Sequence, residues 1–75
     1  MDLNTLHAIT ARLEASKAAG WLSEYLVAWH GRGGQLLPAV TVWRATGVSE
    51  KAVESYIGRL LVGLVAAGNI FVTRS

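Results

Sequence analysis

The sequence has no cysteine, and its 75 residues include only one proline and one phenylalanine. Without cysteine the chain has no disulfide bonds, thiolate catalysis or cysteine-ligated metal sites. Charged residues are scarce too, at 16% of the chain, and the formal net charge is only +2. This weak positive charge permits a nucleic-acid partner but does not by itself predict one.

Long apolar runs are also missing. The most apolar stretch, residues 60–72, is shorter than the eighteen or so residues that span a bilayer, and Gly63, Gly68 and Asn69 interrupt it. The N-terminus carries Asp2 and Asn4 in place of the basic flank of a secretion signal. The sequence therefore predicts no membrane segment and a cytoplasmic location.

Catalytic and cofactor motifs are absent as well. His7 and His30 are the only histidines, and the five carboxylates are dispersed along the chain. The run Gly31-Arg32-Gly33-Gly34 lacks the Gly-Lys-Ser/Thr ending of a phosphate loop, so it is interpreted as a flexible hinge. We expect no enzyme, no bound metal and no cofactor.

Apolar residues are abundant, at 52% of the chain, and three of them are tryptophans. A chain of this size has little interior in which to bury such side chains. Self-association or a protein partner is therefore expected.

Apolar spacing predicts four helices and two short strands. The first helix starts near an Asp2 or Asn4 cap and ends at Gly20. Its apolar face consists of Leu3, Leu6, Ile9 and Leu13. The other predicted elements are a helix over 22–30, a loop over 31–34, a strand over 35–37, a helix from Pro38 to Gly47, a helix from Ser49 to about Ala67, and a strand over 70–73 paired with 35–37. Gly58 and Gly63 within the last helix are expected to allow close approach of another helix. Alternatively, the helix bends or breaks at one of them.

The run Thr46-Gly47-Val48-Ser49, placed between two predicted helices and followed by the stripe Val53, Ile57, Leu60 and then Gly68-Asn69-Ile70, resembles the winged-helix family of DNA-binding domains. The resemblance covers residues 21–72. It implies an all-α fold with minor β structure: a winged-helix-like four-helix domain with a helix-turn-helix and a short two-stranded element. Residues 1–75 would form one domain, with an extra N-terminal helix over 1–20 and the helix-turn-helix core over 21–75.

The same resemblance implies a DNA-binding surface. The helix beginning at Ser49 would enter the major groove, with Ser49, Lys51 and Ser55 at base edges or phosphates. The expected phosphate contacts are Arg32, Arg44 and Arg59. A homodimer or partner interface would use Leu3, Leu6, Ile9, Leu13 and Trp43, although the first four could instead cover their own domain.

The leading hypothesis is a small DNA-binding transcriptional regulator of prokaryotic, phage or plasmid origin that binds double-stranded DNA as a homodimer. Glu50 and Glu54 oppose phosphate binding, since they place carboxylates on the predicted recognition helix. They favour an alternative, a protein-binding module such as a phage accessory factor or inhibitor. A structural subunit of a larger assembly is a third possibility.

Overall fold

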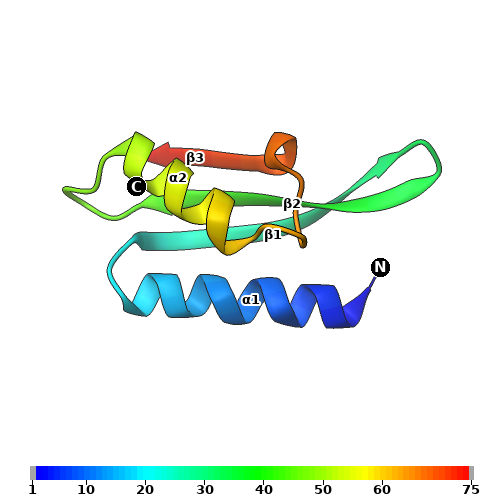
Figure 1. Ribbon diagram of the computed structural model, residues 1–75, viewed down its shortest axis with the longest axis horizontal. Helices are drawn as coiled ribbons and strands as arrows, with labels where there is room; N and C mark the ends of the chain where they lie inside the picture. The colour runs from blue at the N-terminus through cyan, green and yellow to red at the C-terminus, as the bar shows by residue number, and fades with distance from the viewer. Residues whose placement is uncertain (1, 75) are drawn as a thin grey trace.

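The computed structural model describes residues 2–74 and contains two helices, one short 3₁₀ turn and three strands (Figure 1). In chain order these are α1 (Leu3–Ala18), β1 (Leu22–Arg32), β2 (Gln35–Arg44), α2 (Glu50–Leu60), η1 (Ala67–Asn69) and β3 (Ile70–Arg74). The strands form one mixed sheet in the order β1-β2-β3, with β1 antiparallel and β3 parallel to β2. The prediction of an all-α, four-helix, winged-helix-like domain is therefore wrong, because the chain adopts an α/β fold.

A β-hairpin replaces the second predicted helix and the predicted flexible loop. Arg32 pairs with Gln35 in the ladder, so only Gly33 and Gly34 connect the two strands. Their φ angles of 58° and 81° fit the type I′ turn that matches the twist of a two-residue hairpin, and glycine adopts these angles without strain. The apolar residues of 22–30 fit helical spacing, but this turn pairs the segment with β2 instead.

The third predicted helix is also wrong, because residues 38–44 belong to β2. Val40 and Val42 are fully buried at alternate positions, as expected for a strand with one side in the core. Pro38 precedes the first pair with β3, Val40 with Ile70, so at Pro38 the only neighbouring strand is β1. A proline, which has no N–H, is tolerated where a strand has a free side.

The predicted strand at residues 70–73 exists as β3, but its predicted partner is wrong. It pairs in parallel with Val40–Arg44 rather than with residues 35–37. The segment Thr46-Gly47-Val48-Ser49 consequently joins strand β2 to helix α2 and does not connect two helices. Parallel pairing requires a crossover connection, and α2 supplies it.

The predicted starts of the first and the last helix are confirmed. An Asp2 carboxylate oxygen accepts a hydrogen bond from the Asn4 N–H at 3.0 Å, and the Ser49 hydroxyl accepts one from the Ala52 N–H at 3.2 Å. The last helix was predicted too long, since α2 ends at Leu60 rather than near Ala67. Gly63 lies beyond it with φ of 82°, which agrees with the alternative that the helix breaks at a glycine.

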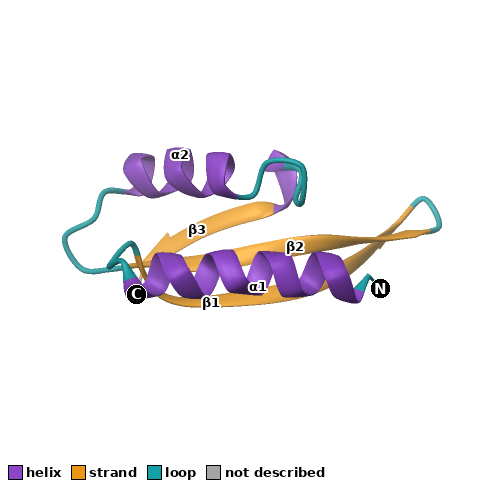
Figure 2. Ribbon diagram, turned by 60° about the horizontal axis from the view of Figure 1, so that its bottom comes forward, coloured by secondary structure: helices purple, strands orange, loops and turns teal. Residues whose placement is uncertain are grey.

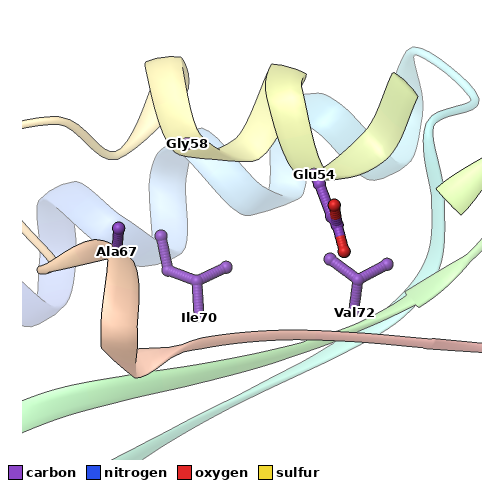
Figure 3. A pocket seen from close by; sticks show the side chains of 5 residues that line it. All are labelled: Glu54, Gly58, Ala67, Ile70 and Val72. Carbon is purple, nitrogen blue, oxygen red and sulfur yellow. The ribbon is translucent and has the colours of Figure 1, made fainter. Parts of the chain in front are cut away.

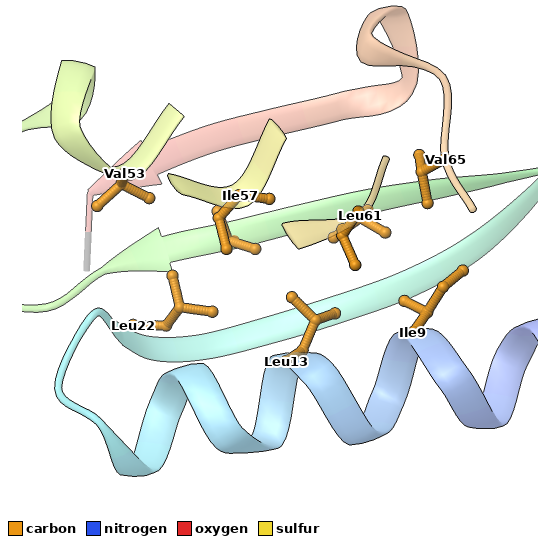
Figure 4. Close-up of a cluster of buried hydrophobic side chains, with 9 residues drawn as sticks. Ile9, Leu13, Leu22, Val53, Ile57, Leu61 and Val65 are labelled. Carbon is orange, nitrogen blue, oxygen red and sulfur yellow. The ribbon is translucent and has the colours of Figure 1, made fainter. Parts of the chain in front are cut away.

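Both helices lie on the same side of the sheet, α1 along β1 and α2 over β2 and β3 (Figures 1 and 2). Side chains from both helices, from the turn after α2 and from strands β1 and β2 form one buried cluster (Figure 4). Its members are Ile9, Leu13, Leu22, Val40, Val42, Val53, Ile57, Leu61 and Val65. The core is therefore one-sided: the helices cover one face of the sheet and leave the other uncovered.

Polar contacts fix α1 and α2 relative to each other. The Arg12 guanidinium donates a 2.7 Å hydrogen bond to the Leu60 carbonyl, which places a cation at the negative end of α2. The buried Ser16 hydroxyl lies 3.3 Å from the Tyr56 hydroxyl, and the Trp21 ring stacks on Tyr56 with centroids 4.3 Å apart. Within residues 2–74, neither helix combines the length and the apolar character needed to cross a bilayer.

We expect Ile57→Ala to lower the free energy of unfolding by about 2–5 kcal/mol, because it leaves a cavity where α1, α2 and the sheet meet. Urea denaturation followed by circular dichroism measures this change. Val62→Ala is the control, since Val62 is 72% exposed and its truncation should have little effect. Equal losses in the two variants would contradict the assignment of this core.

Candidate functional site

The fold leaves one side of the sheet without a second layer. Side chains alternate along a strand, and the register aligns the residues of one face across all three strands. The open face, as we name it, consists of Glu24, Leu26, Ala28, His30, Leu37, Ala39, Thr41, Trp43, Phe71 and Thr73.

Side chains of different size lie next to one another on the open face. Leu26, Thr41 and Phe71 occupy one row across the sheet, with the small threonine between two large apolar side chains. The next row towards the hairpin contains Ala28 opposite Ala39. Small residues thus lie between the larger Leu37 and Trp43 on the open side of β2.

This face exposes large apolar side chains. Leu26 and Phe71 are 56% and 52% exposed, and Trp43 is half-buried on the same face. Its ionisable side chains, Glu24 and His30, both belong to the outer strand β1. A clustered apolar surface of this kind, with charges only along one side, is typical of an interaction site.

Contacts at the start of β1 fix that side of the open face. A Glu24 carboxylate oxygen accepts the Tyr25 N–H at 3.0 Å and lies 3.5 Å from the Lys17 ammonium. The bond from the Tyr25 N–H, and then the charge of Lys17, hold the pKa of Glu24 below its usual value. On the covered side, the Tyr25 hydroxyl donates a 2.7 Å bond to Glu14 of α1.

Three of the predicted DNA-binding residues lie apart or are engaged in the fold. The Arg44 guanidinium donates a 3.0 Å bond to the Val48 carbonyl, and its buried Nε has no hydrogen-bond partner among residues 2–74. The Ser49 hydroxyl caps α2. Arg32 lies at the hairpin tip, far from the start of α2 (Figure 1). The predicted recognition surface therefore does not assemble from these three.

The other three, Lys51, Ser55 and Arg59, follow one another at four-residue intervals along α2, and all are exposed. This spacing places them along one side of the helix. Glu50 and Glu54 lie on the same helix and are also exposed. The structure thus brings together half of the predicted DNA-binding residues, with two carboxylates nearby.

The predicted interface residues do not form one surface. Ile9 and Leu13 are fully buried in the chain's own core, which agrees with the alternative that the first helix covers its own domain. Leu6 is partly buried, whereas Leu3 is 59% exposed. Only Trp43 belongs to the open face. The exposed large apolar residues of this face, Leu26 and Phe71, were missed, because helical spacing assigned Leu26 to the buried side of a predicted helix.

A hollow lies between α2 and β3 (Figure 3). It has a volume of about 280 Å³ and is lined by Glu54, Gly58, Ala67, Ile70 and Val72. Glu54 points from α2 towards Val72 in Figure 3. This volume is at the lower limit for small-molecule pockets, so it suits one or two side chains better than a whole cofactor.

Among residues 2–74, no three histidine or carboxylate side chains come together in a way that could hold a metal ion. The chain matches no protein-family model, no curated protein and no solved structure. The arrangement of its own surfaces must therefore carry any functional inference.

The Tyr25–Glu14 contact leads to a prediction about pH. The hydrogen bond to Glu14, followed by burial, raises the pKa of Tyr25 to about 12. Since the neutral phenol is favoured in the folded chain, its stabilisation is fully present below pH 10 and is lost as pH rises towards 12. We expect the free energy of unfolding of the wild type to fall more steeply over that range than that of Tyr25→Phe, measured by urea denaturation. Identical slopes in the wild type and Tyr25→Phe would refute the assignment.

Proposed function

We propose that the chain is a protein-binding module that works as a homodimer, with the open face as its dimer contact. The observation that carries this proposal is the one-sided core, which leaves Leu26 and Phe71 more than half exposed on a sheet that has no second layer. An apolar sheet face in a chain of this size is most stable when another surface covers it.

The energetic argument favours covering this face. Full burial of a leucine or phenylalanine side chain contributes about 1.5–3 kcal/mol. In a two-fold dimer both copies use the same patch, so each such residue is buried once in each copy. Leu26 and Phe71 from two copies would thus offset a substantial part of the entropy lost on association.

The shape and charge of the open face favour a second copy of the chain as its occupant. The centre of the face is small and uncharged at Ala28, Ala39 and Thr41, so two copies can approach without burying an unpaired charge. Facing sheets pack about 10 Å apart with interdigitating side chains. The large side chains of the two copies would then interdigitate over the small residues.

We expect Leu26→Lys and Phe71→Lys to convert the dimer to a monomer, because each buries an unpaired ammonium in the contact. Sedimentation equilibrium over a range of protein concentrations measures the dissociation constant, which should rise by at least about tenfold. Val62→Lys is the matched control, since Val62 is more exposed than either residue but belongs to the turn after α2. A monomeric wild type, or a dimer unaffected by both substitutions, would rule out the proposal.

A specific observation also favours a second candidate function, binding to nucleic acid through phosphate contacts. Lys51, Ser55 and Arg59 share one exposed side of α2 and present two cations and a hydroxyl, groups that commonly contact phosphates. In this proposal the chain remains a DNA-binding regulator, although it lacks a helix-turn-helix. Glu50 and Glu54 reduce the attraction, so this function ranks second.

For this second function we expect the double variant Lys51→Glu/Arg59→Glu to bind mixed-sequence duplex DNA at least about tenfold more weakly than the wild type. Fluorescence anisotropy between about 50 and 200 mM salt measures the affinity and its salt dependence. The slope of log affinity against log salt should decrease by the amount that corresponds to roughly two phosphate contacts. Arg32→Glu, at the distant hairpin tip, serves as the control. Wild-type protein that fails to bind at the lower salt concentration would eliminate this candidate.

A further inference from the structure

The two outer strands of the sheet differ in how their free edges are protected. On β1, the Glu24 carboxylate accepts the Tyr25 N–H, and the pairing with β2 is irregular between Leu22 and Glu24. Side-chain blocking and bulges are ways in which proteins prevent another strand from pairing with an edge. On β3, pairing with β2 is regular from Ile70 to Arg74, with neither proline nor bulge. The edge of β3 therefore has neither feature along its length, and it is the edge that lies beside the hollow.

The hollow beside β3 matches the spacing of an added strand. Glu54 and Gly58 are one helical turn apart, roughly 6 Å along α2. Ile70 and Val72 are two residues apart, which is roughly 6.6 Å along β3. Figure 3 shows these residues facing one another across the hollow, with Glu54 near Val72. Alternate side chains of an added strand would repeat at the same interval.

No neighbouring group among the described residues requires a glycine at position 58. It lies inside α2, where glycine is a poor helix former, yet a Cβ atom at this position would meet nothing within 4 Å. The prediction that this glycine allows close approach of another helix of the same chain is therefore wrong. The missing side chain instead leaves the wall of the hollow open towards the edge of β3.

Glu54 defines the charge of the hollow. The other lining residues, Gly58, Ala67, Ile70 and Val72, have no ionisable side chain. Among the side chains of residues 2–73, Glu54 makes neither an ion pair nor a side-chain hydrogen bond. A carboxylate beside an apolar hollow favours a ligand that carries a cation next to an apolar side chain.

We propose that the hollow between α2 and β3 binds an extended peptide segment of a partner protein, which adds to β3 as a fourth strand. The peptide carries an apolar residue and a Lys or Arg two positions apart. The apolar side chain packs between Gly58 and Ile70, and the cation pairs with Glu54. Main-chain hydrogen bonds to β3 supply affinity and these two side chains supply specificity. This inference rests on the proposed role as a protein-binding module and names the class of its ligand.

The probes are fluorescein-labelled peptides with the sequences Ser-Thr-Val-Thr-Lys-Thr-Ser and Ser-Thr-Lys-Thr-Val-Thr-Ser, one for each strand direction. Control peptides replace the lysine by glutamate. Fluorescence anisotropy measures affinity, and amide chemical shifts locate the binding. We expect one lysine peptide to bind at least about tenfold more tightly than its glutamate version, with the largest shifts in β3 and α2.

Two variants of the full chain test the lining residues. Glu54→Lys should reverse the preference, so that the glutamate peptide now binds more tightly than the lysine peptide. Glu50→Lys, one turn earlier on α2, is its control with the same change in net charge. Gly58→Leu should abolish binding while making α2 more helical, which separates a filled hollow from a misfolded chain. Ser55→Leu, at an exposed position of α2 that does not line the hollow, should bind like the wild type.

Binding of either lysine peptide that Glu54→Lys and Gly58→Leu leave unchanged would overturn the proposal. So would a lack of binding by both lysine peptides at about 1 mM, the weak limit of specific recognition. The same titrations with Leu26→Lys distinguish this site from the open face. Peptide binding retained in that variant supports the hollow whatever the oligomeric state, whereas a stable wild-type dimer without peptide binding removes only the hollow.

Discussion

The packing of both helices against one face of a three-stranded sheet is the constraint on which the rest of this structure depends. Leu13 of α1 and Ile57 of α2 meet Val40 and Val42 in one continuous buried cluster (Figure 4). A chain of 75 residues has two helices with which to cover its sheet, and both are used on the same side. The open face and the hollow beside β3 are consequences of this choice, because neither remaining surface has a second layer to cover it.

Several of the few charged residues of the chain make contacts within the fold itself. The Arg12 guanidinium binds the end of α2, the Arg44 guanidinium binds the loop before α2, and Lys17 pairs with Glu24. These contacts withdraw three of the seven basic side chains from any common binding surface. The charges that remain on α2 are mixed in sign, which is why recognition of protein segments accounts for this surface better than a phosphate-binding role does.

The two proposed contacts use different physical features of the same sheet. The open face offers apolar contacts, which have no directional requirement, so the same face of a second copy can cover it. The edge of β3 offers directed main-chain hydrogen bonds, and Glu54 adds a single charge beside them. Because one lies on the face and the other beside the edge, a dimer formed through the open face leaves the hollow accessible.

By itself, the sequence determined the features that depend on neighbouring residues. The first helix with its Asp2 cap, the Ser49 cap and a strand near residue 70 were all predicted, since capping and local apolar spacing act within a few residues. Residues 22–30 were assigned to a helix because Leu22, Tyr25, Leu26 and Trp29 fit a helical period. Only tertiary structure decided otherwise, through the hairpin at Gly33-Gly34 and the pairing of Val40 with Ile70, thirty positions away. Strand pairing takes its stability from hydrogen bonds and packing between distant segments, and a local pattern contains no record of those partners.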